Sequence, residues 1–445
     1  MLRDFSVANF KSFYTSDDIR SADPMFTTVA TREQLAGDTL ARVKRRRIVP
    51  ASALYGANAS GKSTFVEALA TLRTVVLSTR ESAEGFPITP HLALGADQPT
   101  SFSVTCVVAD PAGPGDLTFT YELVLTPTRV VEETLWRERS ADDATVFDRR
   151  QEGDQARCEF WGPLDDDPVT HSVATSLGPN ELLLTRLATR PVRGDNDPLA
   201  PVRAVLAWFE RLTIIMPASR YLFLPYRFDL DKEFGKALCD HIATADTGIA
   251  DIKLVEHSGR IPDEVDKEIR RAGVKAIITD TETGDLIAAY YEDGHRVVQA
   301  LKTVHRADNG KEYLLPLSAE SDGTVRLFDL LPAFIDSSYD DTPRVFVIDE
   351  LDRSLHANLT VSLIEVFLRR TGPDSRHQLI FTTHELEIMR KTLLRRDEIW
   401  LVDKADGSTS TLARLSDFDT TRIRKNADLV RAYSSGRLGA IPRSA

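Results

Sequence analysis

Cysteine, long apolar runs and an excess of positive charge are all missing from this sequence, and each absence excludes a class of protein. There are three cysteines, Cys106, Cys158 and Cys239, and none forms a CxxC pair. Neither a disulfide framework nor a cysteine zinc site is expected, and a reducing cytoplasm is the expected location. No run approaches the ~18 apolar residues of a membrane-spanning helix. Residues 1–13 lack the apolar stretch of a signal peptide.

The chain carries 55 Lys and Arg against 67 Asp and Glu, a formal net charge of -12. A uniformly basic surface that coats nucleic acid is therefore excluded. The clearest basic segment contains Arg42, Lys44, Arg45, Arg46 and Arg47. We interpret this segment as a charged lead-in to a buried strand, with a nucleic-acid contact as the alternative.

The composition that remains is typical of a folded protein. Hydrophobic residues make up 42% and charged residues 27% of the 445 positions. This length corresponds to two or three domains, or to one large domain with insertions. The sequence pattern divides the chain into an N-terminal part (1–135), a mainly helical or mixed insertion (136–300) and a C-terminal part (301–445).

Hydrophobic periodicity predicts the elements of the two outer parts. Strands are expected around Phe5 and Val7 and over 48–55, a helix over 65–76, and an antiparallel meander over 101–131. Toward the C-terminus, the apolar runs 345–348 and 379–381 predict buried strands, helices are expected over 359–367 and 386–394, and 399–412 reads as a hairpin. Strands that alternate with helices indicate an α/β fold.

The middle of the chain is less regular, but three segments have a clear pattern. Helices are expected over 198–212 and 262–272, and Asp308-Asn309-Gly310 predicts a hairpin turn. No heptad pattern persists, so a long coiled-coil arm is excluded.

A glycine-rich segment after the second strand matches the pattern G-x-x-x-x-G-K-[ST]. Its residues are Gly56, Ala57, Asn58, Ala59, Ser60, Gly61, Lys62, Ser63 and Thr64. In this pattern backbone N–H groups and a helix N-terminus surround a phosphate chain. Lys62 is expected to contact the β- and γ-phosphates of ATP, and the hydroxyl of Ser63 to bind Mg²⁺.

Two later strand ends supply the remaining groups of a nucleotide site. Asp349 and Glu350 follow the apolar run 345–348. We expect Asp349 to hold Mg²⁺ and Glu350 to act on the attacking water as general base. His384, after the strand 379–381, is expected to reach the γ-phosphate; a structural histidine is the alternative. No protein kinase, GTPase, metalloprotease or nuclease motif competes with this interpretation.

The order of these motifs resembles the ABC-type ATPases, and within them the group that includes RecF, the SMC-like repair ATPases and the overcoming-lysogenization-defect ATPases. The blocks that carry the resemblance are FSVANFKSF (5–13), YGANASGKS (55–63), ESDGT (320–324), VIDELD (347–352) and TTHE (382–385). The ending YSSGRLGAIP (433–442) resembles that of a narrower set, the AAA family ATP-binding proteins of bacterial anti-phage and abortive-infection systems, such as the RloA and PARIS ATPases.

The resemblance implies an ABC-type P-loop fold: a mixed β-sheet core, an antiparallel β subdomain and an inserted helical region. In such ATPases a Ser-Gly-Gly motif of the partner subunit clamps the γ-phosphate, and Ser321 and Gly323 match it. Asp322 departs from the usual glycine, and a simple Ser-Asp-Gly helix cap is the alternative. Asp352 stands where the family has an aspartate that faces across the dimer.

The resemblance also implies the function: a cytoplasmic ATPase that uses ATP and Mg²⁺ and dimerises through its ATP sites, with a higher even-numbered ring as an extension. We expect a sensor and scaffold of anti-phage defence that responds to a phage-derived trigger and controls a separate effector, a nuclease or toxin. A RecF-like repair ATPase that binds DNA is the alternative. A transporter subunit is disfavoured, because Asp349 follows the phosphate loop by about 290 residues.

Overall fold

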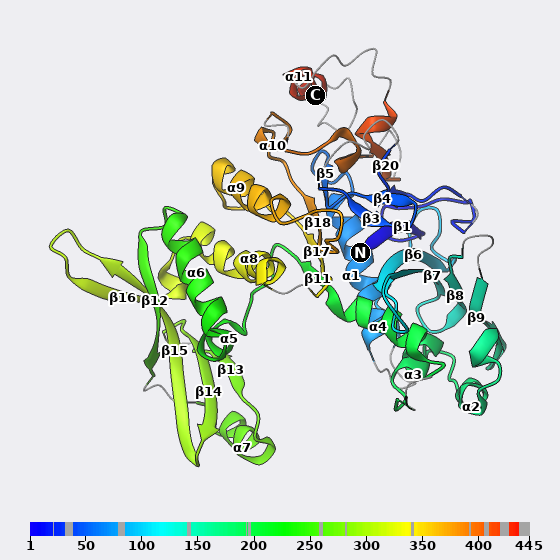
Figure 1. Cartoon of the computed structure of the whole chain (residues 1–445), viewed down its shortest axis with the longest axis horizontal. Coiled ribbons are helices and arrows are strands. Elements are labelled where there is room, and N and C mark those ends of the chain that lie inside the picture. Colours follow the sequence, from blue (N-terminus) through cyan, green and yellow to red (C-terminus); the bar gives the residue numbers. More distant parts are fainter. Residues whose placement is uncertain are drawn as a thin grey trace. The chain divides into compact units, whose positions relative to one another are not determined.

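The computed structural model describes residues 1–445 except for 21, 32–38, 79–84, 140–143, 193, 195–196, 258–260, 281–282, 340–341, 391–392, 405–408, 419–426 and 436–445. Contacts between residues divide the chain into two units (Figure 1). The first unit comprises Met1–Ile215, Asp341–Leu351 and Leu368–Ala445, and the second unit comprises Met216–Asp340 and Asp352–Phe367.

A mixed six-stranded sheet lies in the first unit. Its strands, in spatial order, are β11 (Leu212–Ile215), β17 (Val345–Ile348), β18 (Gln378–Thr382), β5 (Ala51–Tyr55), β19 (Ile399–Asp403) and β20 (Thr411–Arg414). The first five are parallel, and β20 pairs antiparallel with β19. Every residue of β5, β17 and β18 is buried, as expected for parallel strands covered on both faces. Their carboxyl ends therefore meet at one edge of the sheet.

A second, antiparallel sheet of the first unit has seven strands. In spatial order they are β10 (Gln155–Phe160), β9 (Ala144–Glu152), β8 (Val130–Arg137), β7 (Asp116–Leu125), β6 (Thr100–Ala109), β1 (Leu2–Ala8) and β2 (Phe26–Thr27). One face is covered by helices: the rings of Tyr121 on β7 and Phe209 on α4 (Ala200–Arg211) lie 6.0 Å apart. Helix α4 also contacts α3 (Leu183–Ala188), and α2 (Pro168–Thr175) lies beside β10.

Four aromatic rings connect the two sheets through α1 (Lys62–Leu77). Phe65 of α1 lies 5.5 Å from the ring of Phe5 on β1 and 5.1 Å from that of Phe26 on β2. Phe26 in turn lies 4.9 Å from Trp400 of β19. Because these side chains are almost fully buried, the helix that follows the glycine-rich segment is held against both sheets.

The first unit also contains short elements. They are the hairpin β3 (Ala41–Val43) and β4 (Arg46–Ile48), the helices α10 (Glu387–Arg390) and α11 (Ala427–Ser434), and the 3₁₀ segments η2 (Gly162–Leu164), η4 (Arg396–Glu398) and η5 (Leu415–Asp417).

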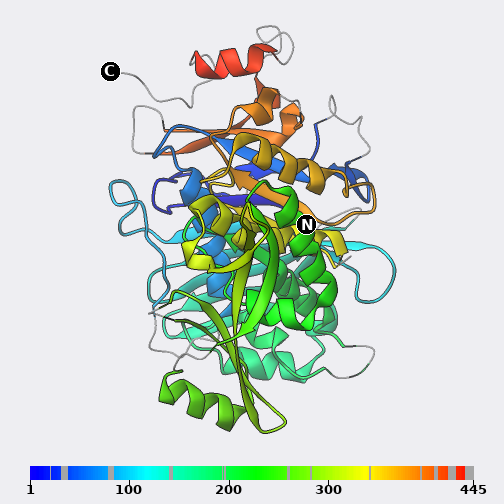
Figure 2. The ribbon, with the colours of Figure 1, turned by 90° about the vertical axis from the view of Figure 1, so that its left-hand side faces the viewer.

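The second unit is built around a five-stranded antiparallel sheet. Its strands run β12 (Ile249–Glu256), β15 (His295–Arg306), β14 (Leu286–Glu292) and β13 (Ala276–Thr279), with β16 (Glu312–Pro316) also paired to β15. Helix α7 (Asp263–Ala272) packs against β14 (Figures 1 and 2). The other elements are α5 (Leu224–Leu230), α6 (Lys232–Thr244), η3 (Leu317–Ala319), α8 (Asp322–Tyr339) and α9 (Ala357–Leu368), which lies in this unit up to Phe367.

The mixed α/β class, the first strand, the meander, the 308–310 turn and the C-terminal strands agree with expectation. The expected strand 48–55 is interrupted instead: β4 ends at Ile48 and β5 begins after Pro50, which has no N–H for a central ladder. The described part of helix 386–394 is only α10, and the turn of the 399–412 hairpin lies outside the described residues.

The two units do not follow the expected divisions at 135 and 300. The antiparallel sheet continues through β9 and β10, and α3 and α4 cover it, so the first unit extends to Ile215. Within the described ranges, none of the helices combines the length and apolar character that a bilayer crossing requires.

Candidate functional site

The glycine-rich segment connects β5 to α1 by a tight turn that only glycine permits at two positions. Gly61 has φ +114°, and a Cβ there would lie 2.5 Å from Oγ of Ser410. A Cβ on Gly56 would lie 2.3 Å from the carbonyl oxygen of Val402. Ala59 also has positive φ, at 61°. The loop backbone therefore packs so closely against the β19–β20 region that a side chain at Gly56 or Gly61 would clash.

Lys62 and the start of α1 make this loop suitable for an anion. The ammonium of Lys62 donates to the carbonyls of Gly56 at 2.8 Å and Ala57 at 3.0 Å, and its side chain is buried. Helix α1 has no side-chain cap at Gly61 and no acidic residue in its first turn. The buried hydroxyl of Ser60 has no hydrogen-bond partner among the described residues. Unpartnered donors around a positive helix end fit a phosphate chain.

The remaining loop residues are placed at the mouth of this turn. Asn58 and Ala59 are exposed, and Ser63 and Thr64 are half-buried on the first turn of α1. Their backbone N–H groups and hydroxyls therefore lie where a nucleotide would have to bind.

Thr382 connects the two acidic residues at the end of β17. Its hydroxyl donates to Oδ1 of Asp349 at 2.6 Å and accepts the backbone N–H of Glu350 at 2.7 Å. The parallel register explains this contact, because Ile348 pairs with Phe381 on the neighbouring strand β18. Asp349 is almost fully buried, whereas Glu350 is half-buried.

Glu350 has the left-handed backbone angle φ 49°. A non-glycine residue in this region costs about 1–3 kcal/mol and is found where the surrounding structure requires it. The hydrogen bond from its N–H to Thr382 holds this conformation. The chain therefore turns sharply at Glu350. The side chains of Asp349 and Glu350 then no longer point to opposite faces of the sheet, as successive residues of a strand do.

His384 leaves the end of β18 toward the glycine-rich loop. Thr382 pairs with Leu54, and the N–H of Thr383 donates to the carbonyl of Leu54 at 3.1 Å. His384 therefore follows at the level of the loop, and it is exposed. The hydroxyl of Tyr55 donates to the carbonyl of Glu385 at 3.1 Å, which ties this segment to β5.

The first unit thus brings together the glycine-rich loop, Asp349, Glu350 and His384 at the carboxyl edge of β17, β18 and β5. Ser321, Gly323 and Asp352 belong to the second unit. The prediction missed Thr382 as a functional residue. A hydroxyl at the end of a buried strand, two residues before the histidine, is the signal that identifies it.

Within the second unit, Ser321 is the N-terminal cap of α8. Its Oγ accepts the N–H of Thr324 at 3.2 Å and lies 2.9 Å from the Thr324 hydroxyl. A Cβ on Gly323 would lie 2.5 Å from the carbonyl oxygen of Ser354, so glycine is needed for this approach. Asp322 is exposed in the first turn, where a carboxylate interacts favourably with the helix dipole. This explains an aspartate there in structural terms.

Asp352 begins the turn that reaches Gly323. Its carbonyl accepts the N–H of Leu355 at 3.1 Å, and Ser354 inside this turn has φ 60°. The turn after the acidic strand end and the start of α8 are therefore packed together within the second unit.

The site fits Mg²⁺ bound together with a nucleotide rather than a metal cage made of protein. The described residues contain no group of three or more His, Cys, Asp and Glu side chains that would hold a metal ion. Mg²⁺ commonly takes one or two protein ligands plus phosphate oxygens and water. Ser63 and Asp349 match that number.

Comparison with known proteins gives one family. A family model described as "AAA domain, putative AbiEii toxin, Type IV TA system" matches residues 51–390. The matched range includes the glycine-rich loop, both acidic strand-end residues and His384. No curated protein matches the chain.

Proposed function

Because the chain belongs to the family of AAA domains described as putative AbiEii toxin of a Type IV TA system, we propose that it is an ABC-type ATPase that hydrolyses ATP in a defence system. Family membership makes it a P-loop ATPase connected with abortive infection. The observation that carries the proposal further is the pair of hydrogen bonds at the Thr382 hydroxyl, which donates to Asp349 and accepts the backbone N–H of Glu350 beside the phosphate loop. Such an arrangement orients two carboxylates for different tasks.

Each residue of this edge has a distinct role in the proposal. Lys62 leaves the carbonyls of its own loop to neutralise phosphate charge, and the N–H groups of 58–64 donate to phosphate oxygens. Ser63 and Asp349 hold Mg²⁺, which would draw negative charge from the reacting phosphate. Glu350 accepts a proton from the attacking water. His384 donates to the terminal phosphate and so distinguishes ATP from ADP.

A second copy of the chain completes the site in this proposal. Ser321, Gly323 and Asp352 of one copy face the nucleotide held by the loop of the other, as the resemblance to ABC-type ATPases implies. ATP then favours the dimer and hydrolysis releases it, which supplies the differential affinity that a switch requires. Dimers can extend to an even-numbered ring.

The cellular role that we propose is sensor and scaffold. A phage-derived trigger changes the ATP-bound assembly, which then releases or activates a separate nuclease or toxin. The resemblance to the RloA and PARIS ATPases supports this role, although residues 436–442 of the similar ending lie outside the described residues.

The biochemical experiment compares Lys62→Ala and Glu350→Gln with the wild type. We expect Lys62→Ala to lose ATP binding, because the cation at the phosphates is gone. We expect Glu350→Gln to bind ATP, to lose at least about 10²-fold in turnover and to accumulate as a dimer with ATP in light-scattering measurements. Glu159→Gln, an exposed acid on β10, is the matched control.

The cellular experiment uses the same variants. Each is expressed with the gene next to its own in the genome, and bacteria are challenged with phage. Full protection by Lys62→Ala would overturn the defence role, and full turnover by Glu350→Gln would overturn the assigned mechanism.

A RecF-like repair ATPase is the second candidate, and one observation favours it. A hollow of the first unit is lined largely by arginine and lysine. DNA binding that requires ATP, together with unchanged phage sensitivity of cells that lack the protein, would favour this candidate.

A further inference from the structure

The basic segment 42–47 folds as the β3–β4 hairpin of the first unit. Ala41, Val43 and Ile48 are buried in a cluster with Met1 and Val107, which anchors the hairpin. Its outer positions carry only cations. Arg42 stands directly opposite Arg47 in the ladder, and like charges in this position destabilise a hairpin. The apolar face of the hairpin therefore keeps it in place against this repulsion.

This hairpin forms one wall of a hollow of about 420 Å³. We call it the hairpin hollow; its lining residues are Arg3, Val43, Lys44, Arg45, Arg46, Thr118, Glu138 and Arg139. Five of the eight are cationic and one is acidic. The cations come from β1, from the hairpin and from the end of β8, so three separate segments converge on it.

Glu138 is already engaged and does not neutralise the hollow. It lies 2.5 Å from Nη1 of Arg3 and 3.2 Å from Nη2 of Arg46. Burial works against its charge, but these two arginines outweigh burial and lower the pKa of Glu138. Arg45 and Arg139 are exposed, and neither makes an ion pair with any residue that the structure describes. The hollow therefore has an unneutralised positive surplus.

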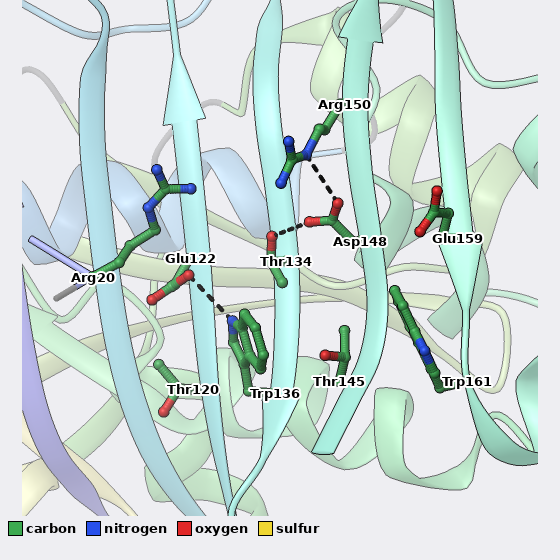
Figure 3. Close-up of a pocket in the computed structure, with 10 residues that line it drawn as sticks. All are labelled: Arg20, Thr120, Glu122, Thr134, Trp136, Thr145, Asp148, Arg150, Glu159 and Trp161. Atoms are coloured by element: carbon green, nitrogen blue, oxygen red, sulfur yellow. Dashed lines mark hydrogen bonds and ion pairs between the residues drawn. The ribbon is translucent and has the colours of Figure 1, made fainter. Parts of the chain in front are cut away.

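A larger hollow, of about 670 Å³, lies on the polar face of the same sheet (Figure 3). Nε of Arg150 lies 3.1 Å from Asp148, and the indole N–H of Trp136 donates to Glu122 at 3.2 Å. Two arginines and three acidic residues line it, so it has no cationic surplus that would bind a polyanion. Of these two hollows, only the hairpin hollow has a surplus of cations.

We propose that the hairpin hollow binds the sugar-phosphate backbone of a nucleic acid. The guanidinium fork of arginine matches phosphate oxygens with two parallel hydrogen bonds, and four of the five cations are arginines. The hollow has room for a phosphate with its sugar. Arg42 and Arg47 continue the positive surface along the hairpin. A small anion bound in the hollow would not contact these two arginines, whereas a polymer would.

The negative net charge of the protein restricts nucleic-acid binding to a local basic patch. With a net charge of -12, the protein as a whole repels polyanions, so that binding must come from a concentrated patch. This inference goes beyond the proposed ATPase, because none of these residues belongs to the nucleotide site.

The experiment measures binding of full-length protein to a 30-base-pair mixed-sequence DNA duplex and to a single-stranded RNA of equal length, by fluorescence anisotropy at several salt concentrations. The test variant is Arg45→Glu with Arg139→Glu. The control is Arg150→Glu with Arg157→Glu, two arginines on β9 and β10 that are 62% and 64% exposed. Both double variants change the net charge equally; the control arginines lie elsewhere on the sheet, where they pair with Asp148 and Glu159.

We expect the test variant to bind at least about tenfold more weakly and to lower the salt slope by about one per lost contact. The control should keep at least most of the wild-type affinity. Equal weakening by both variants, or no binding of either polymer by the wild type in low salt, overturns the proposal. The proposal is also overturned if inorganic phosphate or polyglutamate, added at the same concentration of negative charges as the nucleic acid, displaces it.

ATP turnover and circular dichroism are measured on the same samples. Both should be unchanged in the test variant, because Arg45 and Arg139 are exposed and neither belongs to the phosphate loop. Loss of nucleic-acid binding with normal turnover therefore tests the hairpin hollow, whereas loss of turnover by Lys62→Ala tests the proposed ATPase.

Discussion

Thr382 shows how one hydroxyl group organises two acidic residues. We predict that Thr382→Val, which keeps the shape and removes both hydrogen bonds, lowers ATP turnover about 10–100-fold, the usual cost of losing a group that orients a metal ligand. The Mg²⁺ concentration for half-maximal turnover should rise as well, because Asp349 loses the donor at 2.6 Å. Steady-state turnover over a Mg²⁺ titration measures both quantities.

Thr382→Ser is the matched control, because it restores the hydroxyl without the methyl group. It should recover most of the turnover and the wild-type Mg²⁺ dependence. A valine variant with an unchanged Mg²⁺ titration would show that Thr382 only supports the fold.

The roles of single residues can be predicted from sequence where a local pattern carries them. Gly61 and Lys62 were predicted from spacing alone, since a loop that curls around phosphate needs glycine and a cation at those positions. Thr382 was not, because its partners Asp349 and Glu350 are more than thirty residues away in sequence and become neighbours only through the register of β17 and β18.

At the scale of elements, the short segment η4 buries a carboxyl group beside β5 and β20. Glu398 accepts the N–H of Arg395 at 2.7 Å and is 2% exposed. Burial raises the pKa of Glu398 to about 7 from 4.5, although Arg395 opposes the shift. The folded protein therefore holds this proton between pH 4.5 and 7, where the unfolded chain releases it, so its contribution to stability falls as the pH rises through this range.

We predict that Glu398→Gln, which imitates the protonated form, is more stable than the wild type by about 3 kcal/mol at pH 8. The difference should shrink as the pH falls and vanish only below about pH 4, where the carboxyl group is protonated in the unfolded chain as well. Urea unfolding at pH 5, 6, 7 and 8 measures it, and Glu159→Gln on the surface should show no such trend. A difference independent of pH would contradict the assignment.

Elements with a strong local pattern were predictable, and their ends were less so. The alternation around Phe5 and Val7 and the apolar run 345–348 each correspond to a strand. Pro50 divides the expected strand 48–55, because the missing N–H interrupts a ladder that periodicity alone suggests. β11 was not predicted; it occupies the edge of the parallel sheet through its pairing with β17.

At the scale of the whole molecule, the proposal requires two chains for each active site. We predict that Lys62→Ala and Ser321→Asp are each inactive alone and regain measurable ATP turnover when mixed. Aspartate is a good helix cap, so Ser321→Asp keeps the start of α8 while it places a negative charge toward the phosphates. Mixed dimers would contain one site with both defects and one intact site.

Turnover of the mixture is compared with that of each variant at the same total concentration. A mixture no more active than its components would argue against a shared site. Full activity of Ser321→Asp alone would reduce Ser321 to the cap that the structure shows it to be.

The division into two units depends on contacts between residues far apart in sequence, which local sequence patterns do not predict. The first unit collects three separate stretches of sequence, because β17 and β18 insert between β11 and β5 in one sheet. The basic segment 42–47 was interpreted as a lead-in to a buried strand. It does precede β5, but its convergence with Arg3 and Arg139 arises from packing of β1, β8 and the hairpin.

The amino-acid sequence by itself determined the groups from which the proposed site is built: a phosphate loop, two carboxylates and a histidine, each following an apolar strand. These are local properties, since residue identity, spacing and the hydrophobic pattern are read from neighbouring residues. Only the tertiary structure decided which groups touch. The pairing of distant strands sets the register that brings Thr382 to both acidic residues. Packing of distant segments likewise brings together the cations of the hairpin hollow.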